Sequence, residues 1–246
     1  MKRVRKLALS IVVPTLNEEK YLGKLLFGLG KQVFKNFEVI IVDGRSEDKT
    51  LKIANGFKDA FQLKTYSSLR GTSVQRNFGA KRAKSDNLVF LDADGRLEDK
   101  FLEKLERQIR KENVYLATSW LRPDSSKLVD LFLFSVFNIF YLEFLRRFFP
   151  GSGGAFIYIE RKIFNSVGGF DEKVKYAEDS VLVKRLNKKG YKLRVLRDLK
   201  VYTSVRRLES EGRLKFLSRV LRLNLRFLFK GPIKKFDKFH YEYGKF

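Results

Sequence analysis

Short apolar runs alternate with amphipathic stretches through the first half of this 246-residue chain. Runs that are apolar throughout, such as 39–42, predict strands buried on both faces of a sheet. Because helical stretches separate them, the order predicts an α/β fold with a mostly parallel, Rossmann-like sheet flanked by helices. We expect strands at 9–13, 37–42, 62–66, 87–91, 115–119, 155–159, 193–196 and 200–203, and helices at 18–30, 48–56, 73–83, 99–111, 181–189 and 211–230.

Three of the predicted strands end in acidic or small polar residues. Ligands of open parallel sheets bind beyond the carboxyl ends of the strands, so these ends are candidate binding positions. An acidic side chain there can accept hydrogen bonds from a ribose or a base, although Asp43 is equally suited to a turn before a helix. The group comprises Pro14, Thr15, Glu18, Asp43, Asp92, Ala93 and Asp94.

Asp92 and Asp94 directly follow the predicted strand 87–91. In a strand, residues two positions apart point the same way, so we expect the two carboxylates to converge and repel. A hard divalent cation relieves this repulsion, and Mg²⁺ typically keeps one or two carboxylates while substrate phosphates complete its shell. Taken alone, the pair is also compatible with a solvated turn or a helix cap.

Five segments in order, SIVVPTLNEE, VIIVDGRSEDKT, LVFLDADG, GGFDE and AEDSVLVKRLNKKGYK, resemble the family 2 glycosyltransferases of GT-A fold. The resemblance covers roughly residues 8 to 220. It implies a nucleotide diphosphate sugar as donor, with UDP and GDP both possible, and Mg²⁺ or Mn²⁺ held by Asp92 and Asp94. The donor site it implies comprises Pro14, Thr15, Glu18, Asp43, Arg76, Asp92, Ala93, Asp94, Arg206 and Arg207.

Glu178 and Asp179 match an acidic pair of the same family, which implies that Asp179 is the general base of an inverting transfer. Gly153, Gly154 and Glu178 would lie on the acceptor side. The alternative for Asp179 is a carboxylate stabilised by a helix N-terminus. A base favours a hydroxyl acceptor, a saccharide or a lipid-linked glycan, because a lipid phosphate needs little deprotonation. A polyprenyl- or dolichyl-phosphate glycosyltransferase on the same fold stays open as the alternative.

The formal net charge of +24 suits phosphate-bearing partners: nucleic acid, anionic lipid or phosphorylated small molecules. A basic nucleic-acid-binding module is the weaker hypothesis, since it leaves the carboxylates at the strand ends unexplained. The chain lacks cysteine, which excludes disulfides. The first apolar run is too short for a signal peptide, so we expect a cytoplasmic protein, peripheral on the inner face of the cell membrane.

We divide the chain into a glycosyltransferase domain, 1–205, and a basic amphipathic extension, 206–246. In the extension, Lys215, Arg222 and Lys230 belong to a basic stripe of about 80° beside a leucine-rich face. This pattern favours an anionic membrane surface, or a helix packed on the core with a solvated basic side. In the Leu- and Phe-rich segment 128–149, the unbroken apolar core between Asp130 and Glu143 is too short to span a bilayer, so the segment is a core helix or an in-plane membrane helix.

Overall fold

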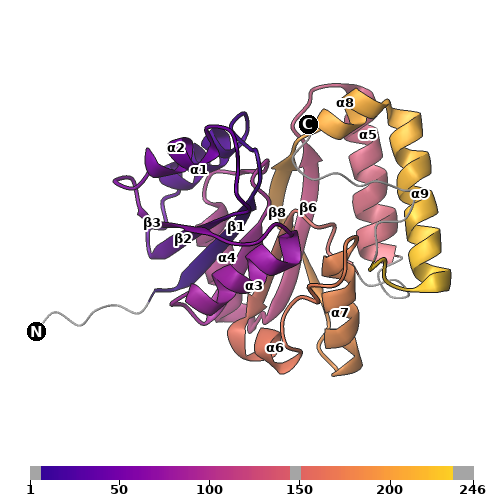
Figure 1. Cartoon of the computed structure of the whole chain (residues 1–246). Helices are drawn as coiled ribbons and strands as arrows, with labels where there is room; N and C mark the ends of the chain where they lie inside the picture. The colour runs from indigo at the N-terminus through magenta and orange to yellow at the C-terminus, as the bar shows by residue number, and fades with distance from the viewer. Residues whose placement is uncertain (1–6, 145–150, 235–246) are drawn as a thin grey trace, which may run out of the picture.

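The computed structural model describes residues 7–144 and 151–234, except for the Leu228 side chain. Its centre is one eight-stranded sheet with the order β3-β2-β1-β4-β7-β6-β8-β5 (Figure 1). The strands are β1 Leu9–Thr15, β2 Phe37–Asp43, β3 Gln62–Ser67, β4 Asn87–Leu91, β5 Arg96–Leu97, β6 Leu116–Pro123, β7 Phe156–Glu160 and β8 Arg194–Thr203.

The sheet is mostly parallel, as predicted. Strands β1 to β4 run in one direction, and β7 pairs antiparallel with both β4 and β6. Strand β6 therefore shares the direction of β4, and β8 follows β6, so that β5 and β7 alone are reversed within the sheet. The predicted strands 193–196 and 200–203 are a single strand, β8, whose register against β6 shifts between Ser119 and Trp120.

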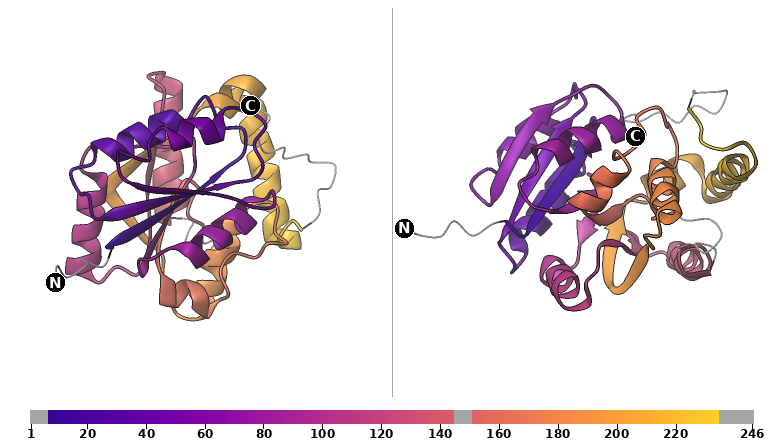
Figure 2. Two further views of the ribbon diagram at one scale, coloured as in Figure 1. Left: turned by 60° about the vertical axis from the view of Figure 1, so that its left-hand side comes forward. Right: turned by 90° about the horizontal axis from the view of Figure 1, so that it is seen from below.

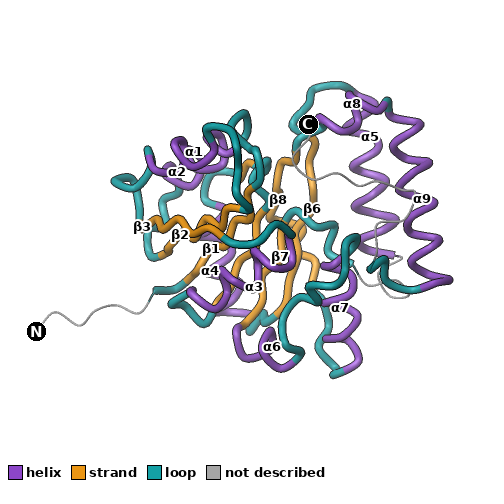
Figure 3. The backbone as a smooth tube through the Cα atoms, viewed as in Figure 1, coloured by secondary structure: helices purple, strands orange, loops and turns teal. Residues whose placement is uncertain are grey.

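Helices cover both faces of the sheet because alternate strand residues point to opposite sides. Ile11 and Val13 join a core beneath α1 Leu22–Lys31, α2 Thr50–Asn55 and α4 Phe101–Glu112. Val12 joins a second core beneath α3 Thr72–Arg82, α6 Arg161–Ser166 and α7 Glu178–Lys188. Figures 2 and 3 show these two helical layers on either side of the strands. With both faces covered, the strand ends are the part of the sheet left for a ligand.

The remaining helices lie toward one edge of the molecule in the view of Figure 1. They are α5 Leu128–Val136, the π-helical segment η1 Phe137–Phe144, α8 Arg206–Glu211 and α9 Arg213–Lys230. The predicted helix 211–230 begins at Arg213, because Gly212 adopts a φ of 80° that ends α8. No helix in the described ranges is both long and apolar enough to cross a membrane. The boundary at 206 stays a prediction, as does the extension beyond residue 234, which lies outside the described residues.

Candidate active site

The ends of β1 and β2 are joined by side-chain hydrogen bonds. Thr15 Oγ1 donates to Asp43 Oδ1 at 3.0 Å, and Asp43 also accepts from the Ser46 backbone N–H at 2.8 Å. Gln75 Nε2 on α3 donates to the carbonyl oxygens of Thr15 and Val42, both at 2.7 Å. Asp43 is fully buried, so its carboxylate orders the loop after β2. Its contact with a nucleotide stays a prediction.

Sequence reasoning missed Gln75, which is 3% exposed and holds two neighbouring strand ends in place. A polar residue on the sheet-facing side of a helix was the available signal. Two other predicted donor residues lie in the same region. Pro14 is half-buried within β1, opposite Val42 of β2, and Ala93 is buried in the turn that follows β4.

Asp92 and Asp94 lie close together in a turn. Strand β4 ends at Leu91, and the backbone N–H of Gly95 donates to the carbonyl oxygen of Asp92 at 3.1 Å. The expectation that strand alternation aligns the two carboxylates is therefore wrong, because the turn positions them. Burial, together with the charge of Asp92, raises the pKa of Asp94 to about 6. Two mutually repelling carboxylates are thus concentrated at this strand end.

Arg206, the first residue of α8, returns to the end of β1. Its terminal nitrogens donate to both carboxylate oxygens of Glu18, at 2.8 and 2.9 Å, and Nη2 is 3.5 Å from Asp94 Oδ2. Burial lowers the pKa of Arg206, but the hydrogen bond to Glu18 and the charge of Asp94 raise it overall. The positive charges of Arg206 and Arg207 oppose, without cancelling, the rise in the pKa of Asp94. The four residues form one charged cluster at the predicted donor site.

The donor atoms fit the metal that the sequence implies. Within the described residues, no group of three or more His, Cys, Asp or Glu side chains is arranged to hold an ion. Asp92 and Asp94 supply carboxylate oxygens only, and the Asp92 side chain is 37% exposed. A pair of hard ligands with an open side suits Mg²⁺ or Mn²⁺ whose other ligands are substrate phosphates and water.

Arg76 is a buried cation between the Asp92 turn and helix α7. Nη2 donates to Asp92 Oδ1 at 2.7 Å and to the carbonyl of Gly154 at 3.1 Å, while Nη1 donates to Glu178 Oε1 at 3.1 Å. The Arg76 side chain is 1% exposed. Burial lowers its pKa, but the charges of Asp92 and Glu178 raise it overall. Its terminal nitrogens bond protein groups, so the structure gives it a linking role beside the predicted nucleotide pocket.

Glu178 and Asp179 begin helix α7, and both are largely buried. Burial raises the pKa of Glu178, and the opposing effect of Arg76 leaves it raised overall. Asp179 accepts hydrogen bonds from the Ser152 backbone N–H at 3.1 Å and from Ser152 Oγ at 2.7 Å. The helix N-terminus and Ser152 therefore stabilise the Asp179 carboxylate. This arrangement leaves a carboxylate at the junction of α7 and the preceding loop.

The loop 151–154 packs tightly against η1. A Cβ atom on Gly151 would lie 2.3 Å from the Tyr141 hydroxyl, so a larger residue there would require the Tyr141 side chain to shift. Gly153 and Gly154 have φ values of 77° and 82°, a left-handed conformation that glycine adopts without strain. Sequence reasoning missed Ser152 and Tyr141. A serine flanked by glycines was the only local signal, because both contacts join distant segments.

The chain was compared with known proteins. The family model for glycosyl transferase family 2 matches residues 10–167. A Methanococcus voltae enzyme, a dolichyl N-acetyl-alpha-D-glucosaminyl phosphate 3-beta-D-2,3-diacetamido-2,3-dideoxy-beta-D-glucuronosyltransferase, is 35% identical over 118 residues, 44% of this chain and 37% of its own. The poly(ribitol-phosphate) beta-N-acetylglucosaminyltransferase TarS of Staphylococcus aureus is 38% identical over 90 residues, 35% of this chain and 16% of its own. The chain thus spans less than two thirds of either relative.

Two solved structures share the fold. Residues 1–349 of TarS in complex with UDP-GlcNAc superpose with a TM-score of 0.67 at 24% identity, over 80% of this chain and 58% of that one. The mannosyltransferase PcManGT from Pyrobaculum calidifontis, in complex with GDP-Man and Mn²⁺, gives a TM-score of 0.69 at 20% identity, over 87% of this chain and 60% of that one. The match of the family model to well over half of the sequence shows that this chain belongs to glycosyl transferase family 2.

Proposed function

We propose that this chain is a metal-dependent, inverting glycosyltransferase that moves a sugar from a UDP- or GDP-sugar to a hydroxyl acceptor. One observation carries the proposal. The guanidinium of Arg76 bonds Asp92 and Glu178 at once, so the proposed metal ligand and the residue next to the proposed base, Asp179, lie on either side of a single side chain. A direct displacement needs a leaving group and a base held close together on opposite faces of the reacting carbon.

In this mechanism Asp92 and Asp94 would hold Mg²⁺ or Mn²⁺, which would offset charge on the diphosphate. Arg206 and Arg207 add positive charge beside the diphosphate. Asp179 accepts the proton of the acceptor hydroxyl as its oxygen bonds to the anomeric carbon, and the bond from that carbon to the diphosphate breaks. Attack from the opposite face inverts the anomeric configuration, and Gly153, Gly154 and Glu178 border the acceptor.

We further propose that the acceptor is a saccharide on a lipid carrier and that the protein works as a peripheral protein on the cytoplasmic face of the membrane. The name of the Methanococcus voltae relative, which contains a dolichyl-linked sugar phosphate, supports the lipid-linked acceptor. A lipid phosphate acceptor, the alternative, would make Asp179 dispensable. A nucleic-acid-binding module leaves the buried Asp94 and Glu178 carboxylates without a role.

The test begins with the donor. Thermal melts with UDP-GlcNAc and GDP-Man, each with Mn²⁺ or with EDTA, should show stabilisation by one nucleotide sugar only when metal is present. Asp94→Ala should abolish that stabilisation, and Asp59→Asn, an exposed control, should retain it. Unchanged binding by Asp94→Ala would remove the metal assignment.

The base is tested separately. Asp179→Asn should retain metal-dependent donor binding and lose transfer by at least about 10²-fold. Transfer at the normal rate to a lipid phosphate would favour the polyprenyl-phosphate alternative, and transfer at the normal rate to a hydroxyl acceptor would remove Asp179 as the base.

A further inference from the structure

Exposed apolar side chains concentrate on two neighbouring helical segments. Of the large hydrophobic side chains exposed among the described residues, seven lie on α5 and η1 and five on α9, against three elsewhere. Leu128, Leu214 and Phe229 are each more than 80% exposed. Figure 1 shows α5 and α9 at the same edge of the molecule, and Arg213 at the start of α9 bonds Asp130 of α5. A concentration of exposed apolar side chains of this kind marks an interaction site.

Packing against the core accounts for only one side of each helix. On α9, at 100° per residue, the exposed large apolar residues from Leu214 to Phe229 fall within an arc of about 120°, whereas Leu223 on the opposite side is buried. On α5, Asp130 is buried and paired with Arg213 of α9, while Phe132 is exposed. Each helix therefore buries its inner side and presents a second apolar stripe outward.

The rim of this surface is positively charged. The eighteen residues of α9 include six basic and no acidic side chains. Lys215, Arg222 and Lys230 are exposed and lie about 80–160° around the helix from the centre of the leucine stripe. The acidic residues of α5 and η1 are engaged, Asp130 by Arg213 and Glu143 by Arg197. Like charges on a second copy would repel this rim, whereas anionic lipid headgroups complement it.

We infer that this docking face lies in the plane of an anionic lipid monolayer. Its apolar part would enter the boundary between headgroups and acyl chains, as amphipathic helices with basic flanks do. Its basic rim would contact the phosphates of the headgroups. The docking face is defined by Leu128, Phe132, Phe140, Leu214, Leu221 and Phe229, with the rim Lys215, Arg222 and Lys230.

The inner side of η1 connects the docking face to the acceptor loop. A Cβ on Gly153 would lie 3.2 Å from the Phe137 ring, and one on Gly151 would meet the Tyr141 hydroxyl. Burial and the charge of Asp179 raise the pKa of Tyr141 to about 12. Two residues on from Phe137, Ile139 is exposed on the outer side. Resting on the proposed function, the inference places the acceptor loop beside the lipid surface and fits an acceptor sugar on a lipid carrier.

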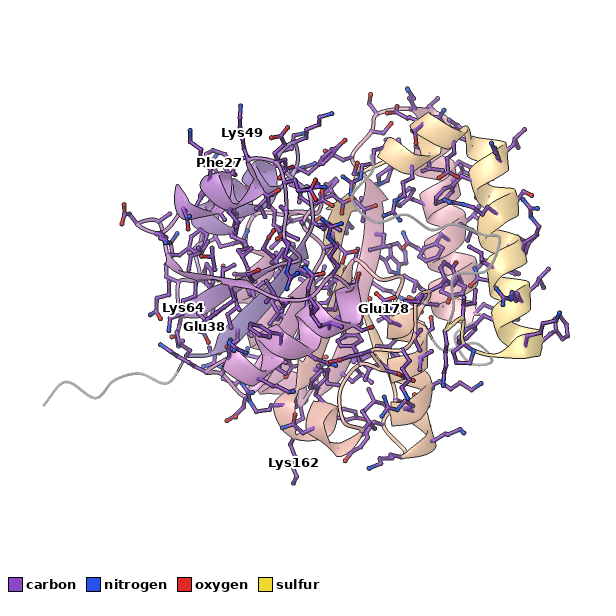
Figure 4. The ribbon with its side chains drawn as sticks, in the orientation of Figure 1. Phe27, Glu38, Lys49, Lys64, Lys162 and Glu178 are labelled. Atoms are coloured by element: carbon purple, nitrogen blue, oxygen red, sulfur yellow. The ribbon has the colours of Figure 1, made fainter. Side chains whose placement is uncertain are left out.

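The test measures binding of the purified full chain to sedimenting vesicles, without donor or metal. We expect binding to phosphatidylcholine vesicles that contain a quarter phosphatidylglycerol, weakened by salt, and at least about tenfold weaker binding to pure phosphatidylcholine. The double variants Phe132→Ser/Phe140→Ser and Lys215→Glu/Arg222→Glu should each lose about tenfold or more. The single changes Phe27→Ser and Lys64→Glu, of the same residue types on the far side of the molecule (Figure 4), are controls that should bind normally.

Equal vesicle binding by the docking-face and control variants would overturn the inference. The inference would also be overturned if the protein does not bind anionic vesicles but forms dimers, measured by light scattering, and the docking-face variants abolish these dimers. The outcome is separable from the proposed function. Sugar transfer without vesicle binding refutes only the docking face, and vesicle binding by a protein that transfers no sugar refutes only the proposed function.

Discussion

Replacing Arg76 with Met removes the cation that joins the two halves of the candidate site. Arg76 Nη atoms lie 2.7 Å from Asp92 and 3.1 Å from Glu178, and both contacts involve a side chain that is 1% exposed. Removing one partner of a buried ion pair costs about 3–5 kcal/mol. The Asp92 carboxylate is 37% exposed, so water screens part of this cost. We expect the free energy of unfolding to fall by about 3 kcal/mol, or the melting temperature by about 6–12 °C.

The loss should depend on pH. Burial already raises the pKa of Glu178 above its ordinary value of 4.5, and Arg76 opposes that rise, so its removal raises the pKa further. A carboxyl group whose folded pKa is raised contributes stability below its unfolded pKa and loses it as the pH rises through the folded value. The loss in the free energy of unfolding caused by Arg76→Met should therefore be smallest near about pH 4 and increase toward neutral pH.

Urea unfolding followed by the fluorescence of Trp120, the single tryptophan, measures both effects. Lys81→Met removes an exposed cation from the same helix, and it should stay within about 0.5 kcal/mol of the parent protein. The buried bridge does not stabilise the fold as described if Arg76→Met loses less than about 1 kcal/mol of stability at neutral pH. The same conclusion follows if its loss of stability at acid pH equals its loss at neutral pH.

Two further predictions concern single side chains. Because the pKa of Asp94 is raised to about 6, Mn²⁺ titrations with nucleotide should show affinity rising about tenfold between pH 5 and pH 7, and Asp94→Asn should flatten the profile. A flat profile in the parent protein would mean that Asp94 is not a ligand. Gly79→Ala would place a Cβ 2.4 Å from Val12 Cγ1 on the sheet, so thermal melts should show a loss of about 1–3 kcal/mol. An unchanged melting temperature would mean that the close contact of α3 with β1 relaxes freely.

Local signals explain what the sequence predicts well. Strands β1, β2 and β4 were predictable because each is an apolar run that stops at a polar residue. The carboxyl ends of neighbouring parallel strands meet at one edge of the sheet, so these polar residues were expected to lie close together. The resemblance to a known family then assigned roles to Asp92, Asp94 and Asp179. The reversed direction of β7 has no such signal, since an apolar strand reads the same either way.

Contacts between distant segments explain what the sequence did not predict. Gln75 reaches Thr15 across sixty positions, Arg76 reaches Glu178 across 102, and Ser152 reaches Asp179 across 27. The segment 128–144 illustrates the same limit, because its composition fits a core helix or an in-plane helix. The burial of Asp130 and the exposure of Phe132 became known only with the tertiary structure.

The reversal of β7 has a consequence for how this chain can diversify. Because β7 runs against β4, its first residue, Phe156, pairs with Leu91, and the loop 151–154 arrives where Asp92 begins. A strand in the common direction would have delivered that loop to the opposite edge of the sheet. One rim therefore receives the proposed metal ligands Asp92 and Asp94 from the chain before β5 and the proposed acceptor loop 151–154 from the chain after β6. If the proposed roles hold, insertions ahead of β7 would change the acceptor side and leave Asp92 and Asp94 in place.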